Sequence, residues 1–326
     1  MKAFVSRAIP PAGLQVLDTA TGLEIDYNSH DAGLSKADLI ARTGQSEGLL
    51  CLLTDTIDAE VLASCPNLKV ISNMAVGYNN IDVAEATRRG ILVTNTPGVL
   101  TDTTADLTWA LLLAVARRIG EGERLVRAGE WHGWGPLQLL GGEVNGKTLG
   151  IIGMGRIGQA VARRALGFNM KVIYHNRSGL DPALESELKA TRVGLDELIA
   201  KSDFVSLHAP YTKETHHLIN AEKLARMQPT SYLINTARGP LVDEAALVAA
   251  LKNNRIAGAA LDVYEEEPVL YPGLRELDNA VLAPHLGSAT HQTRGEMSRL
   301  AATNLVMALS GKRPLHPVNP DVLEKK

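Results

Sequence analysis

Short apolar runs alternate with segments of helical periodicity along this chain, in two successive rounds. We interpret the runs as strands: Ala3–Val5, Leu23–Asp26, Gly48–Leu53, Val70–Asn73 and Ile91–Thr94 in the first round, then Thr148–Ile152, Val172–Tyr174, Phe204–Leu207, Tyr232–Asn235, Ala257–Leu261 and Val281–Ala283 in the second. Helical stretches such as Asp58–Ser64 and Val83–Arg89 separate them. Alternation of this kind predicts an α/β fold with two doubly wound parallel sheets.

The ends of the second round indicate how the two sheets are connected. A segment with Pro97 and Gly98 joins the rounds and leads into a helix expected over Thr101–Arg118. A last helix, roughly Thr290 to Ser310, precedes a tail without strands, which should return to the first sheet. The prediction is a nucleotide domain, residues 99–287, inserted into a discontinuous substrate-binding domain of residues 1–98 and 288–326. Ligands of such folds bind at the carboxyl ends of the strands.

Composition narrows the class of protein. A chain of 326 residues has room for two domains, because single cores stop growing near ~250–300 residues. The net charge of -3 argues against nucleic acid or an anionic membrane as the main partner. The two cysteines, Cys51 and Cys65, lack metal-type spacing, so we expect a reduced compartment and no metal site.

Neither a signal peptide nor a membrane span is expected. The N-terminus lacks an apolar signal core. The most apolar stretch, Leu107–Ala116, is shorter than the ~20 residues that cross a bilayer. We interpret it as a buried helix at a domain or subunit contact, and we expect a cytoplasmic protein.

The first strand of the second round runs into Gly-Met-Gly-Arg-Ile-Gly and then a helical pattern. In a strand–turn–helix unit, Gly153 permits the tight turn, Gly155 lets a pyrophosphate approach the backbone and Gly158 lets helix and strand pack closely. The helix start at Arg156 and Ile157 offers N–H groups and a positive dipole end to phosphates. This predicts a Rossmann-like dinucleotide site. A glycine-rich turn without a ligand is the alternative.

The end of the next strand bears on the choice of cofactor. An acid usually follows the glycine motif by about 20 residues and binds the ribose 2′-OH. Here no acid occurs before Asp181. Arg177, with Asn176 and Ser178, could instead bind a 2′-phosphate through charge-assisted hydrogen bonds. The sequence favours NADP(H), with NAD(H) possible, unless Arg177 is simply a solvated turn residue.

Three loops that follow second-round strands carry candidates for chemistry. Reduction of a 2-keto acid needs a cation for the carboxylate, a proton donor for the carbonyl oxygen and a group that orients the donor. Arg238, His285 and Glu267 supply these three types of side chain. Such residues occur in the loops of any long α/β chain, so spacing alone leaves a structural interpretation open. His216 and His217 are expected on the surface.

Four segments in this order resemble the D-2-hydroxyacid dehydrogenases, and the resemblance covers essentially the whole chain. They are Gly-Met-Gly-Arg-Ile-Gly at 153–158, Asn-Thr-Ala-Arg-Gly at 235–239, Leu-Asp-Val-Tyr-Glu-Glu-Glu-Pro at 261–268 and Pro-His-Leu-Gly-Ser-Ala-Thr at 284–290. Stretches at 50–55, 74–82, 98–106 and 287–291 look most like the glyoxylate/hydroxypyruvate reductases of that family.

The resemblance implies a role for each matching position. His285 would be the acid/base, Glu267 would orient and polarise it, and Arg238 would bind substrate. The residues expected around the substrate are Leu53, Val76, Gly77, Trp134, Arg238 and Ser288. Those expected around the cofactor are Thr104, Gly153, Gly155, Arg156, Ile157, Gly158, Asn176, Arg177, Ser178, His208, Ala209, Pro210, Thr215, Thr236, Ala237, Arg238, Asp262, His285 and Gly287. NAD-type members carry an acid where His175 stands, which again favours NADP(H).

The implied activity is the NADPH-preferring reduction of glyoxylate to glycolate and of hydroxypyruvate to D-glycerate. A reductase of longer 2-keto acids, such as 2-ketogluconate, is the alternative among enzymes. Oxidation of D-3-phosphoglycerate is less expected, because the chain ends near residue 326 without an added regulatory domain. A cofactor-sensing binding protein, like the corepressors that share this fold, is the alternative of another class. It should carry a peptide-binding extension, which is not evident here.

A loop with two tryptophans predicts how the chain assembles. Trp131 and Trp134 lie in a Gly- and Pro-containing segment after a helix, where large apolar side chains are costly to expose. The pattern Trp-x-x-Trp-x-Pro-Leu resembles the loop that hydroxypyruvate reductases extend across their dimer interface. This implies a homodimer with Leu107–Ala116 in the interface and Trp134 acting on the partner's substrate. Alternatively, the loop folds onto its own subunit.

Overall fold

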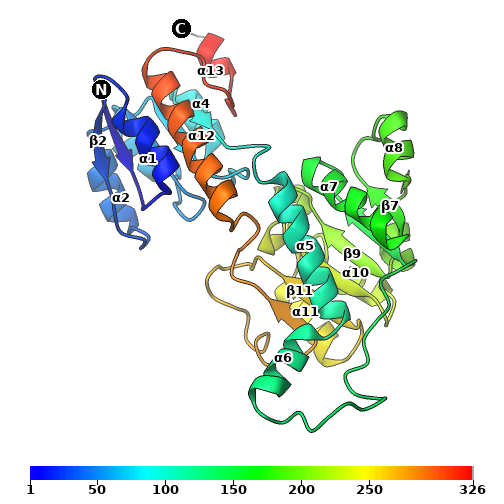
Figure 1. Cartoon of the computed structure of the whole chain (residues 1–326). Helices are drawn as coiled ribbons and strands as arrows, with labels where there is room; N and C mark the ends of the chain where they lie inside the picture. The colour runs from blue at the N-terminus through cyan, green and yellow to red at the C-terminus, as the bar shows by residue number, and fades with distance from the viewer. Residues whose placement is uncertain (325–326) are drawn as a thin grey trace. The chain divides into compact units, whose positions relative to one another are not determined.

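The computed structural model describes residues 1–324, and the chain divides into two compact units (Figure 1). Unit 1 comprises residues 1–100 and 289–326, and unit 2 comprises residues 101–288. Each unit contains one parallel sheet, of five strands in unit 1 and seven in unit 2. The α/β fold with two doubly wound parallel sheets is therefore confirmed.

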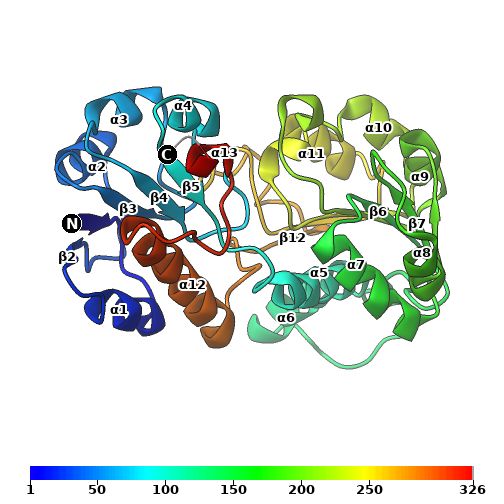
Figure 2. The ribbon, with the colours of Figure 1, turned by 90° about the horizontal axis from the view of Figure 1, so that it is seen from above.

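Unit 1 is a five-stranded sheet in the order β2-β1-β3-β4-β5. Its strands are β1 (Lys2–Val5), β2 (Glu24–Tyr27), β3 (Gly48–Cys51), β4 (Val70–Asn73) and β5 (Leu92–Thr94). Helices α1 (Pro11–Asp18) and α12 (His291–Leu309) cover one face, and α2 (Lys36–Thr43), α3 (Ala59–Ser64) and α4 (Val83–Arg88) cover the other (Figure 2). All residues of β3 and β4 are buried, which explains the apolar run of β3 and the apolar first half of β4.

The C-terminal segment returns to unit 1, as predicted from its lack of strands. Helix α12 begins at the cap residue Thr290, whose side chain accepts a hydrogen bond from the Thr293 N–H. The Ser72 hydroxyl of β4 donates to the Ala301 carbonyl of α12 at 2.7 Å. After α12 the Val318 N–H donates to Val93 of β5 at 2.8 Å, and the short helix α13 (Asp321–Glu324) follows.

Unit 2 is a seven-stranded sheet in the order β12-β11-β10-β9-β6-β7-β8. Its strands are β6 (Thr148–Ile152), β7 (Lys171–His175), β8 (Ala190–Arg192), β9 (Phe204–Leu207), β10 (Tyr232–Asn235), β11 (Gly258–Leu261) and β12 (Ala280–Leu282). Helices α5 (Thr101–Ala116) and α7 (Arg156–Ala165) cover one face, and α9 (Leu195–Lys201), α10 (Ala221–Arg226) and α11 (Glu244–Lys252) cover the other (Figure 2). Helices α6 (Ile119–Arg127) and α8 (Pro182–Leu188) complete the unit.

A separate hydrophobic core lies on each face of this sheet. The α5 side includes Trp109, which is buried, stacks on Phe168 and donates its indole N–H to the Val161 carbonyl at 3.1 Å. The other side packs α9–α11 against the strands through Leu198, Leu247 and similar side chains. The helix predicted around Leu107–Ala116 is therefore part of the core of unit 2.

The turn from β6 into α7 explains two of the three motif glycines by sterics. Gly153 has a φ of +94°, which L-residues rarely adopt. A Cβ on Gly158 would collide with the carbonyl oxygen of Gly153. Gly155, the residue that caps α7, has φ -77°, and a Cβ there would meet nothing within 4 Å. The space beside Gly155 is therefore not required by the fold.

Within residues 1–324, no helix combines the length and apolar character needed to cross a membrane.

We expect Gly158→Ala to lower the free energy of unfolding by about 1–3 kcal/mol, because the added methyl group overpacks the contact between α7 and Gly153. Gly155→Ala is the matched control. It places the same methyl group in open space and should change stability by less than about 1 kcal/mol. Urea titrations of both variants measure the difference. Equal losses in the two variants would contradict this account.

Candidate active site

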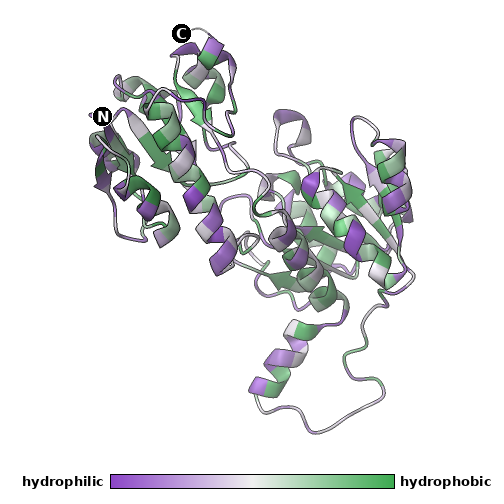
Figure 3. Cartoon of the chain, turned by 45° about the horizontal axis from the view of Figure 1, so that its top comes forward, coloured by the Kyte–Doolittle hydropathy of each residue, from purple (hydrophilic) through white to green (hydrophobic). Residues whose placement is uncertain are grey.

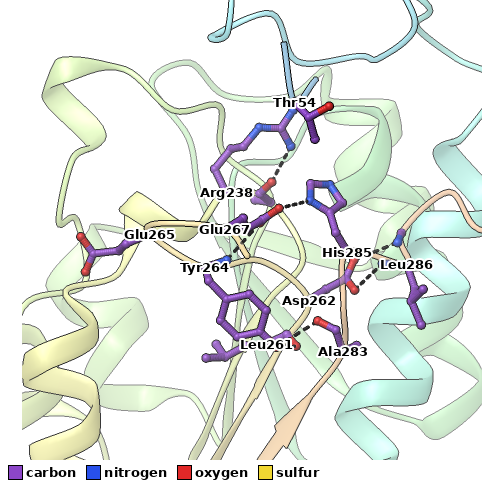
Figure 4. Close-up of polar contacts among 12 residues, drawn as sticks. Thr54, Arg238, Leu261, Asp262, Tyr264, Glu265, Glu267, Ala283, His285 and Leu286 are labelled. Carbon is purple, nitrogen blue, oxygen red and sulfur yellow. Dashed lines mark hydrogen bonds and ion pairs between the residues drawn. The ribbon is translucent and has the colours of Figure 1, made fainter. Parts of the chain in front are cut away.

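His285 and Glu267 form an ion-pair geometry at the carboxyl ends of β11 and β12 (Figure 4). The His285 Nδ1 lies 2.7 Å from the Glu267 Oε2, and the two side chains are 25% and 29% exposed. The other oxygen of Glu267, Oε1, accepts the Tyr264 N–H at 3.1 Å. The pair is therefore oriented by the backbone yet open to solvent or a ligand.

The pKa of Glu267 lies below its usual range. Burial acts to raise it, but the side chain of His285, the Tyr264 N–H and the charge of Arg238 together favour the carboxylate. Glu267 is thus a negative charge beside the His285 ring, which stabilises the imidazolium.

Arg238 lies in the loop after β10, and hydrogen bonds to the backbone of that loop fix its position. Asn235 donates its amide to the Arg238 carbonyl at 2.9 Å and accepts the Ala237 N–H at 3.0 Å. The guanidinium Nη1 donates to the Ala237 carbonyl at 2.7 Å. Burial lowers the pKa of Arg238, while the nearby Glu267 acts in the opposite direction. A partly desolvated guanidinium of this kind suits a carboxylate ligand.

Asp262 holds the loop that carries His285. Its carboxylate accepts the N–H groups of Leu286 at 2.6 Å and Gly287 at 2.8 Å, and its carbonyl accepts the His285 N–H at 2.9 Å. These bonds fix His285 at φ +55°, an unusual backbone conformation for a non-glycine residue. Burial raises the pKa of Asp262, although the two N–H groups and His285 oppose the shift.

Two threonines expected around the nicotinamide lie against these loops within unit 2. The Thr104 hydroxyl donates to the Gly287 carbonyl at 3.0 Å. The Thr236 hydroxyl lies 2.8 Å from that of Thr108 in α5. The structure thus brings Thr104, Asp262 and Gly287 together, and the side chains of Thr104 and Asp262 are already bonded to the backbone of Gly287.

The first turn of α7 has the features that a pyrophosphate requires. Its first N–H groups, which include those of Arg156 and Ile157, have no acceptor within the helix, and Gly155 carries no side chain that could cap them. Gly153 packs against the backbone of His208 and Ala209, which follow β9. The residues present therefore fit a dinucleotide phosphate at this turn.

His208 is held neutral beside that turn. Its ring Nε2 lies 2.8 Å from the Ser206 hydroxyl, and its backbone N–H donates to the Ile152 carbonyl at 2.7 Å. Burial lowers the pKa of His208 to about 3. Thr215, farther along the same loop, uses its hydroxyl to bond Pro210 at 2.9 Å and Thr212. The side chains of His208 and Thr215 therefore shape the loop that is expected on the adenosine side.

The loop after β7 is ordered by two residues that the sequence did not single out. Arg192 of β8 donates to the carbonyls of Asn176 at 3.0 Å and Arg177 at 2.7 Å. The Tyr174 hydroxyl accepts the Leu180 N–H at 2.9 Å and donates to Glu185. The Arg177 side chain is exposed beyond this braced backbone. Because β8 was not predicted, Arg192 had no place in the sequence argument.

The three expected substrate residues of unit 1 lie on two loops that are joined to each other. Asn80 donates its amide to the carbonyls of Leu52 at 3.1 Å and Asp55 at 3.0 Å, which fixes the loop containing Leu53. Asn73 donates to the Gly77 carbonyl at 2.9 Å and to the Asn80 Oδ1 at 3.2 Å. Val76 and Gly77 are half-buried at this joint. Asn80 was not singled out because a polar loop residue has no periodic signal, and Asn73 because it was interpreted only as the end of a strand.

Trp134 and Ser288 lie in unit 2, away from any regular element. Trp134 is 84% exposed in the segment between α6 and β6, where Trp131 is 53% and Leu137 81% exposed. Ser288 directly follows the Gly287 that Asp262 and Thr104 hold. His217, which the sequence placed at the surface, is instead half-buried with its Nε2 2.9 Å from Glu265.

Known proteins are similar to this one over almost its whole length. Residues 109–287 match the family model described as the NAD binding domain of D-isomer specific 2-hydroxyacid dehydrogenase. The chain is 50% identical to the glyoxylate reductase of Thermococcus litoralis, over 99% of this chain and 98% of that protein. It is 49% identical to the glyoxylate reductase of Korarchaeum cryptofilum, over 99% and 97%.

Two solved structures give the same result. A protein of Thermus thermophilus is 48% identical with a TM-score of 0.90, covering 98% of this chain and all of that one. The NADPH-dependent glyoxylate/hydroxypyruvate reductase of Sinorhizobium meliloti, solved with NADP and malonate, is 35% identical with a TM-score of 0.86, covering 97% and 96%. The chain belongs to the D-isomer specific 2-hydroxyacid dehydrogenase family.

Proposed function

We propose that this protein reduces small 2-keto acids, glyoxylate to glycolate and hydroxypyruvate to D-glycerate, with NADPH as the preferred cofactor. The observation that carries the proposal is the His285–Glu267 pair at 2.7 Å, on a unit whose β6–α7 turn fits a dinucleotide phosphate. The names of the relatives, glyoxylate reductase and glyoxylate/hydroxypyruvate reductase, agree with it.

The reduction needs a hydride from the cofactor and a proton from the protein. When bound, a nicotinamide cofactor would supply the hydride, the two-electron donor for C2 of the keto acid. Arg238 presents a planar guanidinium to the substrate carboxylate. Since Nδ1 of His285 faces Glu267, Nε2 is the ring atom that donates a proton to the carbonyl oxygen. Glu267 keeps the ring oriented and favours its protonated form before transfer. The products are the 2-hydroxy acid and the oxidised cofactor.

The proposal predicts that His285→Ala reduces kcat with glyoxylate by ~10²–10⁴-fold, because no other group donates the proton. The cofactor Kd, followed by fluorescence titration, should change little. Arg238→Lys serves as a second variant. It should mainly impair substrate use, since an ammonium group cannot form the planar fork. If the wild-type protein oxidises no NADPH with either keto acid, the proposed activity is wrong.

The preference for NADPH rests on the loop after β7. Arg177 is exposed, no acid occupies the strand end, and Arg192 braces the loop through backbone carbonyls. The 2′-phosphate would then be bound by Arg177, Asn176 and Ser178. The pKa of nearby Glu214 is lowered, chiefly by Thr212 and in part by the charge of Arg177, so Arg177 projects a positive field here.

Arg177→Ala should weaken NADPH binding by roughly 10–150-fold, the equivalent of losing a charge-assisted contact of ~1.5–3 kcal/mol, and leave NADH nearly unchanged. The loop backbone should persist, because Arg192 holds carbonyls rather than the Arg177 side chain. Arg163→Ala is the matched control, as it removes an exposed arginine that pairs with Glu187. A comparable loss for NADH and NADPH would refute the cofactor assignment.

The assembly that we propose is a homodimer formed through α6 and residues 128–147, with the Leu107–Ala116 stretch of α5 also at the interface. These segments extend away from the sheet of unit 2 and carry apolar positions (Figure 3). Trp134, Leu137 and Leu140 are 84%, 81% and 63% exposed, and a groove of about 650 Å³ is lined in part by Ile119 and Val126 of α6 and by Leu139. Apolar side chains in such numbers are typical of a surface that another chain covers.

A complementation experiment tests whether Trp134 completes the partner's substrate site. Trp134→Ala and His285→Ala chains, each crippled alone, are mixed after dissociation. If Trp134 acts on the partner, one site of each mixed dimer keeps both groups and about half of its activity returns. If Trp134 acts within its own chain, no activity returns. A Trp134→Ala protein with normal kcat/KM contradicts the proposal outright.

A further inference from the structure

His217 and Glu265 form a bridge on the far side of the loop that carries Glu267. The His217 Nε2 lies 2.9 Å from the Glu265 Oε2, with the two side chains 33% and 25% exposed. Glu265 points away from His285, whereas Glu267 points toward it (Figure 4). Glu267 lies inside a turn closed by the Val269 N–H and the Glu266 carbonyl at 2.8 Å, whereas Glu265 precedes this turn.

Glu265 is also the main anchor of this loop. Its Oε1 accepts the Glu244 N–H at 2.8 Å at the start of α11, and its own N–H donates to the Glu244 Oε1 at 3.0 Å. Gly239 packs beneath the Tyr264–Glu265 peptide so closely that a Cβ would collide with it. The loop therefore rests on Gly239, which follows β10, and on the start of α11 at Glu244, and Glu267 extends from it to His285.

The anchor brings two carboxylates close together. Glu244 is buried, and its pKa is raised, first by burial and then by the negative charge of Glu265. Because an ionised carboxylate only accepts hydrogen bonds, the His217 Nε2 must be the donor to Glu265. Without this donor, Glu265 would keep one backbone partner while the repulsion from Glu244 remained.

His217 itself belongs to the loop that follows β9. Its N–H donates to the Pro240 carbonyl at 2.9 Å, two residues beyond Arg238. Its ring stacks on that of the exposed His216, with centroids 3.9 Å apart, and its backbone has φ +49°. The backbone of His217 is therefore fixed by the Arg238 loop, and its ring is fixed by His216 and by Glu265.

We infer that His217 and Glu265 are positioning residues for proton transfer: through the loop between Glu265 and Glu267, they set the distance between the Glu267 carboxylate and the His285 ring. The inference rests on the proposed role of His285. It assigns His217 no contact with substrate, and it links the β9 loop, expected on the adenosine side, to the orientation of the acid.

The test compares single substitutions, each with a matched control at the same or the next position. Glu265→Gln removes the bridging charge, and Glu266→Gln makes the same change at the exposed next residue. His217→Ala removes the donor, whereas His217→Gln retains an N–H donor. Glu267→Gln shows how far kcat and its pH profile change when His285 loses its charged partner altogether. Circular dichroism and thermal unfolding of each full-length variant accompany the kinetics.

We expect His217→Ala and Glu265→Gln to lower kcat by about tenfold with little change in KM, because a small misplacement of a reacting group is costly. The pH profile of kcat for reduction should move to lower pH, since a displaced Glu267 carboxylate favours the charged ring less. His217→Gln should recover most of the rate, and Glu266→Gln should match the wild type.

A second readout does not depend on any substrate. NMR of ¹⁵N-labelled histidine rings follows the titration of His285, assigned by its loss in His285→Ala. Its midpoint should move to lower pH in folded His217→Ala and in Glu265→Gln. A wild-type midpoint in both overturns the positioning role, even if the protein turns out to act on another substrate. A loss of kcat without any change in the profile or midpoint, or an equal effect of Glu266→Gln, also overturns it.

Discussion

The candidate active site depends on the buried carboxylate of Asp262. It accepts the N–H groups of the two residues that follow His285, and so keeps His285 in a left-handed backbone conformation. Such a conformation costs on the order of 1–3 kcal/mol, and hydrogen bonds to a charged acceptor contribute about 1.5–3 kcal/mol each. Two such bonds offset a strain of this size. Without them the His285 ring would have no fixed direction toward Glu267.

Around this carboxylate, polar side chains divide by exposure into two kinds. Asp262, Thr104 and Thr236 are buried, and each is bonded to protein, so they shape the loops. His285 and Glu267 bond to each other but retain about a quarter of their surface. A reacting group needs access to its substrate, which His285 and Glu267 retain.

The sequence predicted most of the fold because its strongest signals are local. Buried strands such as β3 and β10 are continuous apolar runs, and two glycines of the β6–α7 turn, Gly153 and Gly158, meet a steric demand of that turn. Strand β8 was missed because only one of its three residues is buried. Without β8, nothing suggested that Arg192 braces the loop next to Arg177. The chemistry of that loop was predictable, but its support was not.

The three glutamates at 265–267 show where local reasoning ends. In an extended chain, residues two apart point to the same side, so Glu265 and Glu267 would share one partner. Glu267 instead lies inside the turn from Glu266 to Val269, which Glu265 precedes, and the partners are residues 48 and 18 positions away, His217 and His285. A run that resembles a uniform acidic patch thus contains an anchor, an exposed residue and the partner of the acid. Only tertiary structure distinguishes them, because what differs among the three is the neighbour that each carboxylate meets.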